Sequence, residues 1–308
     1  MLDTPILFLV FNRLDTTKQV LAAIRKAQPR QLFIAADGPR PTKVGEYEKC
    51  LEVRETVDDS IDWPCEVHRL YRENNSGSGP AVSEAITWFF SQIEMGIILE
   101  DDCLPDDSFF EYADKVLHRY ANDERIMHVS GHNLQCGMER GKNSYYFSKL
   151  PATWGWATWK RAWIKFSFDF YQDTDSDIIN VLSRSLGRQS YVDYYFNEIQ
   201  ATKNNLVSAW DYQWFYVLMR NDAISITPQS NLIINLGFDA YGTHTFTAPY
   251  WYKYLVNKPL RDMSFDEEII INEKADSFYL SLTMGRRTIE TIYIKGLYKL
   301  KKVFGFNQ

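Results

Sequence analysis

The sequence of 308 residues lacks any apolar run long enough to cross a membrane as a helix. Such a helix needs about 20 consecutive apolar residues, and the apolar run nearest the start, residues 6–11, is far shorter. No basic segment precedes this run, so we do not expect it to be a secretory signal peptide.

Cysteine is scarce and widely spaced. The residues Cys50, Cys65, Cys103 and Cys136 contain no C-x-x-C pair, which argues against a structural zinc site or a disulfide scaffold and favours a reducing, cytoplasmic environment. There is also no excess of positive charge, because 34 basic residues face 40 acidic ones and the net charge is -6. This balance argues against a general nucleic-acid-binding protein.

The first half of the chain alternates short apolar runs with amphipathic segments. The apolar runs predict strands over residues 6–11, 31–36, 66–71, 96–99 and 126–130. The amphipathic segments predict helices over residues 17–26, 46–57, 79–93 and 107–120. This alternation is typical of an α/β fold, with a Rossmann-like, mainly parallel sheet and flanking helices.

The glycine fingerprint of dinucleotide-binding folds is absent. Gly77-Ser78-Gly79 precedes a predicted helix, but no third glycine follows at the required position. We therefore exclude a dinucleotide-dependent dehydrogenase.

The second half, from about residue 143, is rich in aromatic residues and loses the regular alternation. It predicts helices over 156–163, 178–186, 191–203 and 212–220, and strands over 224–227 and 232–235. We expect one domain over residues 1–250, with a nucleotide-binding half at 1–142 and an acceptor half at 143–250. A C-terminal tail at 251–308 follows.

Polar and charged residues follow four of the predicted strands. They are Asn12 and Arg13, then Asp37, then Arg72, then the triplet Glu100-Asp101-Asp102. Ligands of open parallel sheets bind beyond the carboxyl ends of the strands, so these side chains predict one polar binding site.

The acidic triplet has two interpretations. Adjacent carboxylates repel one another, and their oxygens suit hard divalent cations such as Mg²⁺ or Mn²⁺. The stretch also suits a solvated acidic turn, because Asp106, Asp107 and Ser108 have the composition of a helix start. The residues alone leave both interpretations open.

A resemblance to a known family appears at this point. The run Ile98-Leu99-Glu100-Asp101-Asp102, followed by Pro105-Asp106-Asp107-Ser108-Phe109-Phe110-Glu111-Tyr112, resembles the acidic motif of the N-acetylglucosaminyltransferase I family. In that family an E-D-D follows a strand, and a similar D-F-F-E-Y run opens the next helix. Residues 4–13, Trp154-Gly155-Trp156, Trp210-Asp211 and residues 227–244 resemble further elements in the same order. The family's W-D-D-W is here one residue longer, as Trp210-Asp211-Tyr212-Gln213-Trp214.

The resemblance implies an inverting, metal-dependent glycosyltransferase of the GT-A fold. The expected donor is a nucleotide-diphospho-sugar, with UDP as the nucleotide and a hexosyl or N-acetylhexosaminyl group to transfer. Asp102 would bind Mn²⁺ or Mg²⁺, and Glu100 and Asp101 would contact the donor's sugar and ribose. Arg13 and Asp37 would hold the nucleotide.

The same resemblance implies roles on the acceptor side. Asp211 would be the general base, with Trp210 and Trp214 as apolar walls that suit sugar rings and raise the pKa of a carboxyl group. We expect Trp154 in the cleft as well. His244 would meet the diphosphate or the metal from a glycine-bracketed loop, although an inert surface loop is equally ordinary there. The expected acceptor is a glycan or a lipid-linked saccharide in surface polysaccharide biosynthesis.

Two other functions remain open at this stage. A sugar nucleotidyltransferase also uses acidic groups and a metal, but it normally carries a glycine-rich basic loop where this chain has Asn12-Arg13-Leu14-Asp15. A glycan-binding module without activity on the same fold would bind carbohydrate without metal or nucleotide.

The C-terminal stretch is basic and has apolar residues at helical spacing. It contains Lys295, Lys299, Lys301 and Lys302 against the single acid Glu290. One interpretation is an interfacial helix that holds the protein at the inner face of a membrane with anionic lipid. The other is a helix packed on the domain with its basic face in solvent.

Overall fold

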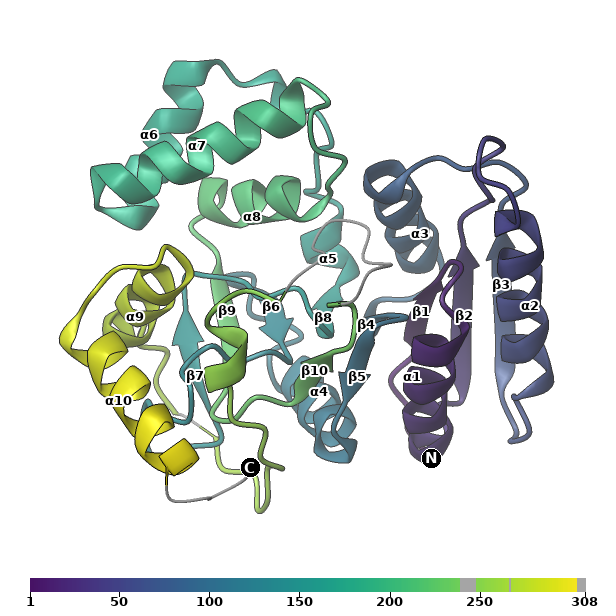
Figure 1. The fold of residues 1–308 in the computed structure, drawn as a ribbon, viewed down its shortest axis with the longest axis horizontal. Helices are drawn as coiled ribbons and strands as arrows, with labels where there is room; N and C mark the ends of the chain where they lie inside the picture. Colours follow the sequence, from purple (N-terminus) through teal and green to yellow (C-terminus); the bar gives the residue numbers. More distant parts are fainter. Residues whose placement is uncertain (239–247, 266, 304–308) are drawn as a thin grey trace.

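A sheet of eight strands, flanked by helices on both faces, forms the centre of the computed structural model, which describes residues 1–238, 248–265 and 267–303 (Figure 1). The strand order is β3-β2-β1-β4-β8-β6-β9-β7. The strands are β1 (Ile6–Val10), β2 (Gln31–Ala36), β3 (Glu66–Tyr71), β4 (Met95–Glu100), β6 (Ile126–Ser130), β7 (Tyr145–Ser148), β8 (Trp156–Trp159) and β9 (Ile224–Pro228).

The sheet is mixed and mainly parallel, as the sequence predicts. β1 pairs in parallel with β2 and β4, β2 with β3, and β6 with β9. Only β8 and β7 run in the opposite direction among these described strands. A second, two-stranded sheet joins β5 (Cys103–Pro105) to β10 (Ile233–Asn235). This small sheet joins the segment that follows β4 to the segment that precedes residue 239.

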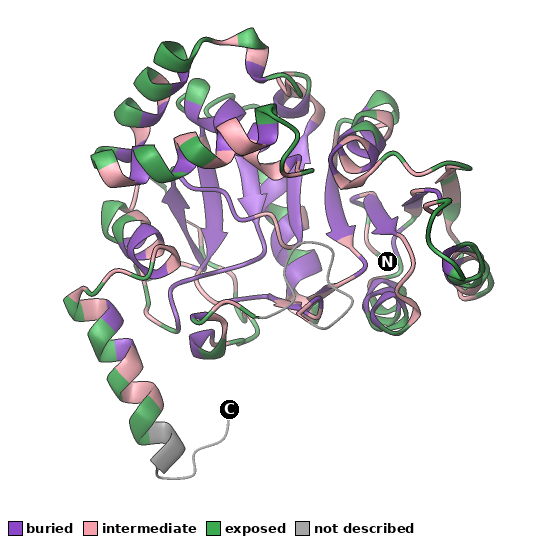
Figure 2. Ribbon diagram, turned by 45° about the horizontal axis from the view of Figure 1, so that its top comes forward, coloured by how far each residue is buried: buried purple, intermediate pink, exposed green. Residues whose placement is uncertain are grey.

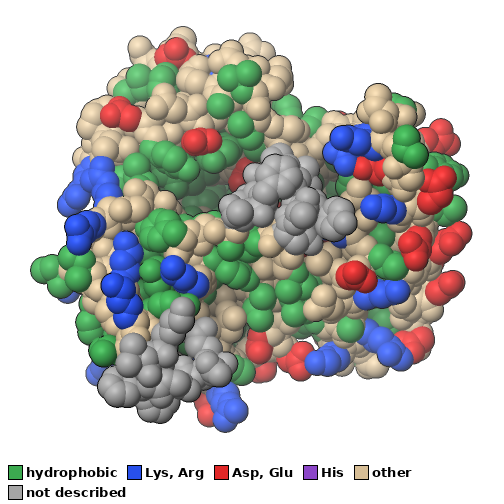
Figure 3. Space-filling model, in the orientation of Figure 1, with side chains coloured by type: hydrophobic (Ala, Val, Ile, Leu, Met, Phe, Trp, Pro, Cys, Tyr) green, Lys and Arg blue, Asp and Glu red, His purple; other side chains and the backbone are tan. Residues whose placement is uncertain are grey.

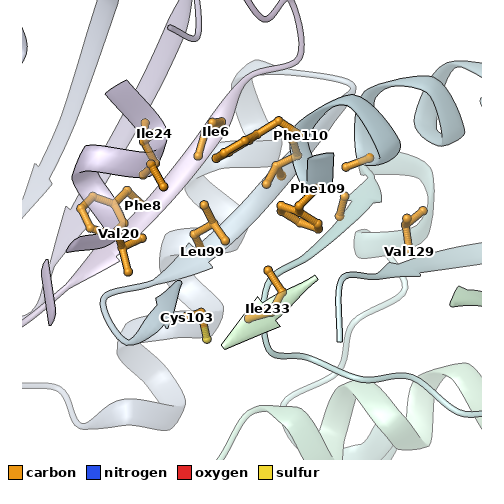
Figure 4. Close-up of a cluster of buried hydrophobic side chains, with 14 of the residues drawn as sticks. Ile6, Phe8, Val20, Ile24, Leu99, Cys103, Phe109, Phe110, Val129 and Ile233 are labelled. Atoms are coloured by element: carbon orange, nitrogen blue, oxygen red, sulfur yellow. The ribbon is translucent and has the colours of Figure 1, made fainter. Parts of the chain in front are cut away.

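One face of the main sheet is covered by α1 (Leu14–Ala27), α2 (Glu46–Asp59) and α4 (Asp107–Arg119). Strand side chains alternate between faces, so Ile6 and Phe8 of β1 point into this core and Leu7 points into the other. Figure 4 shows Phe109 and Phe110 of α4 in this core with Leu99 of β4. Burial on both faces explains why the first strands read as continuous apolar runs.

The opposite face carries a core rich in tryptophan. It is covered by α3 (Ser78–Gln92), α5 (Lys160–Trp163), α6 (Asp175–Leu186), α7 (Gln189–Lys203) and α8 (Asp211–Arg220), with the short 3-10 helix η1 (Phe170–Gln172) between α5 and α6. Trp156 of β8 stacks on Trp210 at 5.4 Å between ring centroids. This core holds α8 against the sheet.

The predicted helix over residues 156–163 is wrong in its first half. Residues 156–159 form β8, which lies between β4 and β6, and only Lys160–Trp163 is helical. Trp156 points into one core, and Ala157 and Trp159 belong to the other. The spacing of the tryptophans suggested a helix, but burial on both faces of the sheet suits an extended segment.

The chain after residue 250 packs against the rest of the molecule. It contains η2 (Tyr252–Tyr254), α9 (Glu273–Thr283) and α10 (Ile289–Val303). Trp251, Leu255 and Phe278 form a third apolar cluster with Leu134. None of the helices in the described part of the chain is long and apolar enough to cross a membrane. Figure 2 shows that burial is concentrated in the strands and that the outer helices are largely exposed.

Two histidines are buried in the core near the end of β6. The indole Nε1 of Trp214 donates a hydrogen bond of 3.1 Å to Nδ1 of His128, whose Nε2 lies 3.1 Å from the Ala152 carbonyl oxygen. Because that oxygen only accepts, Nε2 must carry the proton. Burial lowers the pKa of His128 to about 3 and that of His132 to about 4. Both rings are therefore neutral near pH 7.

We expect acid to destabilise the protein through His128. The pKa of His128 is about 3 in the folded protein, compared with the reference value of 6.5. As pH falls below about 6.5, the unfolded chain therefore takes up a proton at His128 that the folded protein does not, and the free energy of unfolding decreases. Between pH 6.5 and pH 4.5 this residue accounts for a loss of about 2–3 kcal/mol. Urea unfolding at both pH values measures this loss, with His128→Asn, which cannot titrate, compared with the wild type. An equal pH dependence in the two proteins would contradict the prediction.

Candidate active site

A cleft of about 810 Å³ opens at the carboxyl ends of β1, β2 and β4. Its lining includes residues of α3 and α8, two helices that Figure 1 draws on the same side of the sheet. The predicted site residues that line the cleft are Asn12, Arg13, Asp37, Arg72, Glu100, Asp101, Asp102, Trp154 and Asp211. His244 lies outside the described residues. The structure thus brings side chains from distant parts of the sequence into one space.

The acidic triplet forms the floor of the cleft at the end of β4. Arg13 donates from Nη1 to Oδ2 of Asp102 at 2.8 Å, and the backbone N–H of Phe11 donates to Oδ2 of Asp101 at 3.2 Å. Removal from water raises the pKa of Glu100 well above its usual value, and the charges of Asp102, Asp101 and Asp211 raise it further. Burial, then the charge of Asp102, also raises the pKa of Asp101. These carboxyl groups therefore hold their protons more readily than ordinary carboxyl groups do.

Asp102 is also held by the chain that follows β10. The backbone N–H of Leu236 donates to the Asp102 carbonyl oxygen at 2.7 Å, and the N–H of Gly237 donates to Oδ1 of Asn235 at 2.8 Å. A Cβ atom on Gly237 would overlap the Asp102 carboxylate, so any other residue here would force that side chain to move. Asn235 and Gly237 both line the cleft, and the sequence analysis did not place them in the site. The available indication was a glycine two residues after a predicted strand.

The residues at this floor suit a divalent cation as a partner of a bound ligand. No group of three or more His, Cys, Asp or Glu side chains that could hold a metal occurs in the described part of the chain. The protein can offer the Asp102 carboxylate as one hard oxygen ligand, and the other ligands must then come from a bound phosphate group and water. A cation bound beside Glu100 and Asp101 would favour their charged forms and lower these raised pKa values.

Asp37 organises a loop at the rim of the cleft. Its carboxylate accepts hydrogen bonds from the N–H groups of Gly38, Ser76 and Gly77 and from Nδ2 of Asn75, all between 2.9 and 3.1 Å. Both oxygens are therefore engaged with the segment that leads into α3. The sequence analysis expected Asp37 to hold a nucleotide, which stays a prediction; in the structure Asp37 lines the cleft and holds its rim loop.

Two more arginines lie on the same side of the cleft. Arg72 forms an ion pair of 2.8 Å with Glu84 of α3. Arg40, which the sequence analysis did not select, lines the cleft and is bound by the carboxylate of Glu46, whose Oε1 also accepts from Asn12 at 2.9 Å. Each cation is oriented by a carboxylate, so the guanidinium groups are positioned before any ligand arrives.

The opposite wall comes from α7 and α8. Asp211 is the first residue of α8, and Oδ1 of its side chain accepts from the backbone N–H of Tyr212 at 3.1 Å. Glu198 of α7 also lines the cleft. The charge of Asp211 contributes to the raised pKa of Glu100, so the two walls are close enough to interact.

The expectation that Trp214 forms an apolar wall beside Asp211 is wrong. Its side chain is fully buried and bonds to His128 in the core, whereas Trp210 lines the cleft. Residues 210 and 214 lie one helical turn apart on the inner face of α8. Only the one at the helix start therefore reaches the cleft.

Trp154 stands among aromatic rings at the far end of the cleft. Its ring centroid lies 5.4 Å from that of Phe238, 5.9 Å from Trp251 and 4.5 Å from His132. Trp154 and Phe238 both line the cleft, as the sequence analysis expected for Trp154. Such a surface offers an apolar face to a sugar ring or a base.

Comparisons with known proteins place glycosyltransferases among the matching solved structures. No family model and no curated protein matches the sequence. The mannosyltransferase PcManGT from Pyrobaculum calidifontis, in complex with GDP-Man and Mn²⁺, matches with TM-score 0.33 and 13% identity over 51% of this chain and 46% of its own. This chain thus spans less than half of that protein. Mouse xyloside xylosyltransferase 1 matches with TM-score 0.34 and 13% identity over 71% and 82%. A cytidylyltransferase from Leptospira borgpetersenii matches with TM-score 0.30 and 11% identity over 54% and 64%.

We predict that Gly237→Ala disturbs the floor of the cleft. The added methyl would overlap the Asp102 carboxylate, so the variant should lose about 1–3 kcal/mol of unfolding free energy. Gly296→Ala is the matched control, because no atom lies within 4 Å of its Cβ position on the α10 helix; it should gain about 0.5–1 kcal/mol. Urea unfolding measures both. Equal stability of Gly237→Ala and the wild type would contradict the close approach.

We also predict that Asp37→Asn loosens residues 75–77. An amide replaces one acceptor oxygen with a donor that faces N–H groups, so the amides of Ser76 and Gly77 should exchange with deuterium roughly tenfold faster. The exposed Asp59→Asn is the control and should leave this segment unchanged. Hydrogen exchange with mass spectrometry measures the exchange rates in both variants. Unaltered exchange of residues 75–77 in Asp37→Asn would refute the role of Asp37 in holding this loop.

Proposed function

We propose that this protein is a GT-A-type glycosyltransferase that uses a nucleotide-diphospho-sugar. One observation carries the proposal: the acidic floor at Asp102 and the carboxylate of Asp211 face the same cleft from opposite walls. The sequence resemblance to the N-acetylglucosaminyltransferase I family supports it. A transferase of this kind needs a site for a diphosphate and a base for an acceptor hydroxyl, and this cleft offers candidates for both.

The donor is proposed to lie along the β1–β4 side. Arg13, Arg40 and Arg72 line this side and suit phosphate oxygens, because guanidinium groups bind them in pairs of hydrogen bonds. Glu100 and Asp101 are proposed to accept hydrogen bonds from sugar and ribose hydroxyls. Asn12 is proposed to contact the nucleotide, and Asp37 holds the rim loop against it.

The metal is proposed to be Mn²⁺ or Mg²⁺, with Asp102 as its protein ligand. When bound, it supplies a Lewis acid that stabilises the negative charge developing on the leaving diphosphate. Arg13 holds the Asp102 carboxylate in place at 2.8 Å. His244 is proposed as a second contact to the diphosphate or metal.

Asp211 is proposed as the general base. Its carboxylate takes the proton of the acceptor hydroxyl while that oxygen forms a bond to the anomeric carbon. The bond from that carbon to the diphosphate breaks, and the diphosphate leaves with the electron pair. A single displacement inverts the configuration, and Asp211 retains the proton. Trp154 and Phe238 provide an apolar surface for a sugar ring.

The remaining features of the proposal concern substrates and organisation. The donor is proposed to be a UDP-hexose or UDP-N-acetylhexosamine, and the acceptor a glycan or lipid-linked saccharide of a surface polysaccharide. Residues 1–250 are proposed to form the transferase unit, with a nucleotide-binding half at 1–142 and an acceptor half at 143–250, and residues 251–308 are proposed as a C-terminal tail.

Donor binding is tested by thermal shift with UDP, GDP, CDP and TDP, each with and without Mn²⁺. A ligand that binds only the folded state raises the melting temperature. We expect a Mn²⁺-dependent rise with one nucleotide that is lost in Asp102→Ala. The absence of any shift would contradict the proposal and favour a glycan-binding module. Release of pyrophosphate from a nucleoside triphosphate and a sugar 1-phosphate would indicate a nucleotidyltransferase instead.

The role of Asp211 is tested with Asp211→Asn and, as a control, Asp222→Asn, which lies two residues beyond the other end of the same helix. Removing a general base slows turnover by about 10²–10⁴-fold, while the Mn²⁺-dependent thermal shift should persist. Release of the nucleoside diphosphate from the donor identified above measures turnover. Near-normal turnover in Asp211→Asn would end the assignment.

A further inference from the structure

The C-terminal helix α10 turns an apolar face to solvent. Ile289, Ile292, Tyr293 and Leu300 are 88%, 53%, 57% and 55% exposed, respectively. At 3.6 residues per turn these positions lie on one side of the helix. Scattered single apolar residues on a surface are ordinary, but four on one face of one helix form a continuous patch. We call these four residues the α10 apolar face.

The other side of α10 is fixed to the body of the protein. Thr291 and Ile294 are buried, and Ile294 packs in the apolar cluster that contains Trp251 and Phe278. The ring of Tyr298 stands edge-on to that of Tyr254 at 5.2 Å between centroids. The α10 apolar face therefore cannot turn inward while these contacts hold.

An ion pair fixes the start of the same helix. Nη1 of Arg140 donates to Oε1 of Glu290 at 3.1 Å, and the Arg140 side chain is only 8% exposed. Glu290 is the single acidic residue in the sequence of α10. Its charge is thus paired with the body and directed away from the exposed face.

Basic side chains border the α10 apolar face. Lys295 and Lys299 lie one turn apart along one edge, and the exposed Arg287 comes two residues before the helix. The Lys295 Nζ is 5.2 Å from the centroid of the Tyr250 ring. In Figure 3, lysine and arginine side chains gather over the region where Figure 1 draws α9 and α10. This basic region stands out because the whole chain has a net charge of -6.

We propose that α10 is an interfacial helix that docks the protein on an anionic lipid surface. Isoleucine, leucine and tyrosine side chains along one face, with lysines at its edge, have the chemistry of helices that lie in the plane of a bilayer surface. Each lysine near an anionic surface strengthens binding. Of the two interpretations from the sequence, the packing of the helix on the domain is confirmed, through Ile294 and Tyr298. The side in solvent carries apolar side chains as well as Lys299, and the proposal rests on this combination.

A lipid surface fits this face better than a second copy of the chain. An antiparallel symmetric contact through this face would place the lysine edges of two copies side by side, and like charges repel. A partner protein would also need a groove that fits the convex α10 apolar face. A bilayer surface needs none, because the apolar side chains insert between the lipid headgroups. The docking proposal does not rest on glycosyl transfer, because no residue of the α10 apolar face lines the cleft.

Co-sedimentation with vesicles tests the proposal on the full chain. We expect binding to vesicles of phosphatidylcholine and phosphatidylglycerol in equal parts, and little binding to pure phosphatidylcholine. Binding should weaken with added salt. Ile292→Glu with Leu300→Glu should lower affinity at least roughly tenfold, and Lys299→Gln roughly fivefold.

The matched control is Ile164→Glu, an isoleucine with 71% exposure on a different helix end. It should bind vesicles as the wild type does. All variants should melt like the wild type and keep the nucleotide-dependent thermal shift, which separates docking from donor binding. Equal sedimentation of the double Glu variant and the wild type would overturn the proposal. So would a wild-type dimer in light scattering that the double variant abolishes, because it would assign the face to a second copy.

Discussion

The structure depends on a buried acidic end of a central strand. β4 carries Ile97, Ile98 and Leu99 through the middle of the sheet and then delivers Glu100 directly into the cleft. Carboxylates at the edge of an apolar core are costly unless a cation or hydrogen bonds offset their charge. Arg13 from the neighbouring strand end and the backbone N–H of Phe11 provide part of that compensation. The remaining imbalance is available to a bound cation.

The two walls of the cleft are built on different principles. The β1–β3 side is held by polar contacts, since the Asp37 carboxylate gathers the N–H groups of the rim loop and Arg54 bonds to the carbonyl oxygens of Asp37 and Arg72. The α8 side is held by apolar packing, since Trp210 stacks on Trp156 of the sheet. Polar preorganisation suits a phosphate-bearing ligand, and aromatic walls suit sugar rings.

The C-terminal helix α10 is attached to the loop that follows β6. Arg140, from the loop after β6, holds Glu290 and also donates to Gln135. The same loop region carries Leu134, which packs with Ile294 of α10 in the third apolar cluster. A helix fixed in this way presents its apolar face in one defined orientation. If that face meets lipid, the orientation of the cleft toward the membrane is fixed as well.

The sequence by itself determined β1, β2, β4 and β6 and the helices between them, because burial on both faces leaves continuous apolar runs that are visible without a structure. It also placed polar residues such as Asn12 and Asp102 at strand ends, which topology brings to one edge. Tertiary structure alone decided that residues 156–159 form a strand, because their two faces enter different cores. It also decided that Trp214 is buried and that Gly237 contacts Asp102, since both depend on segments distant in sequence.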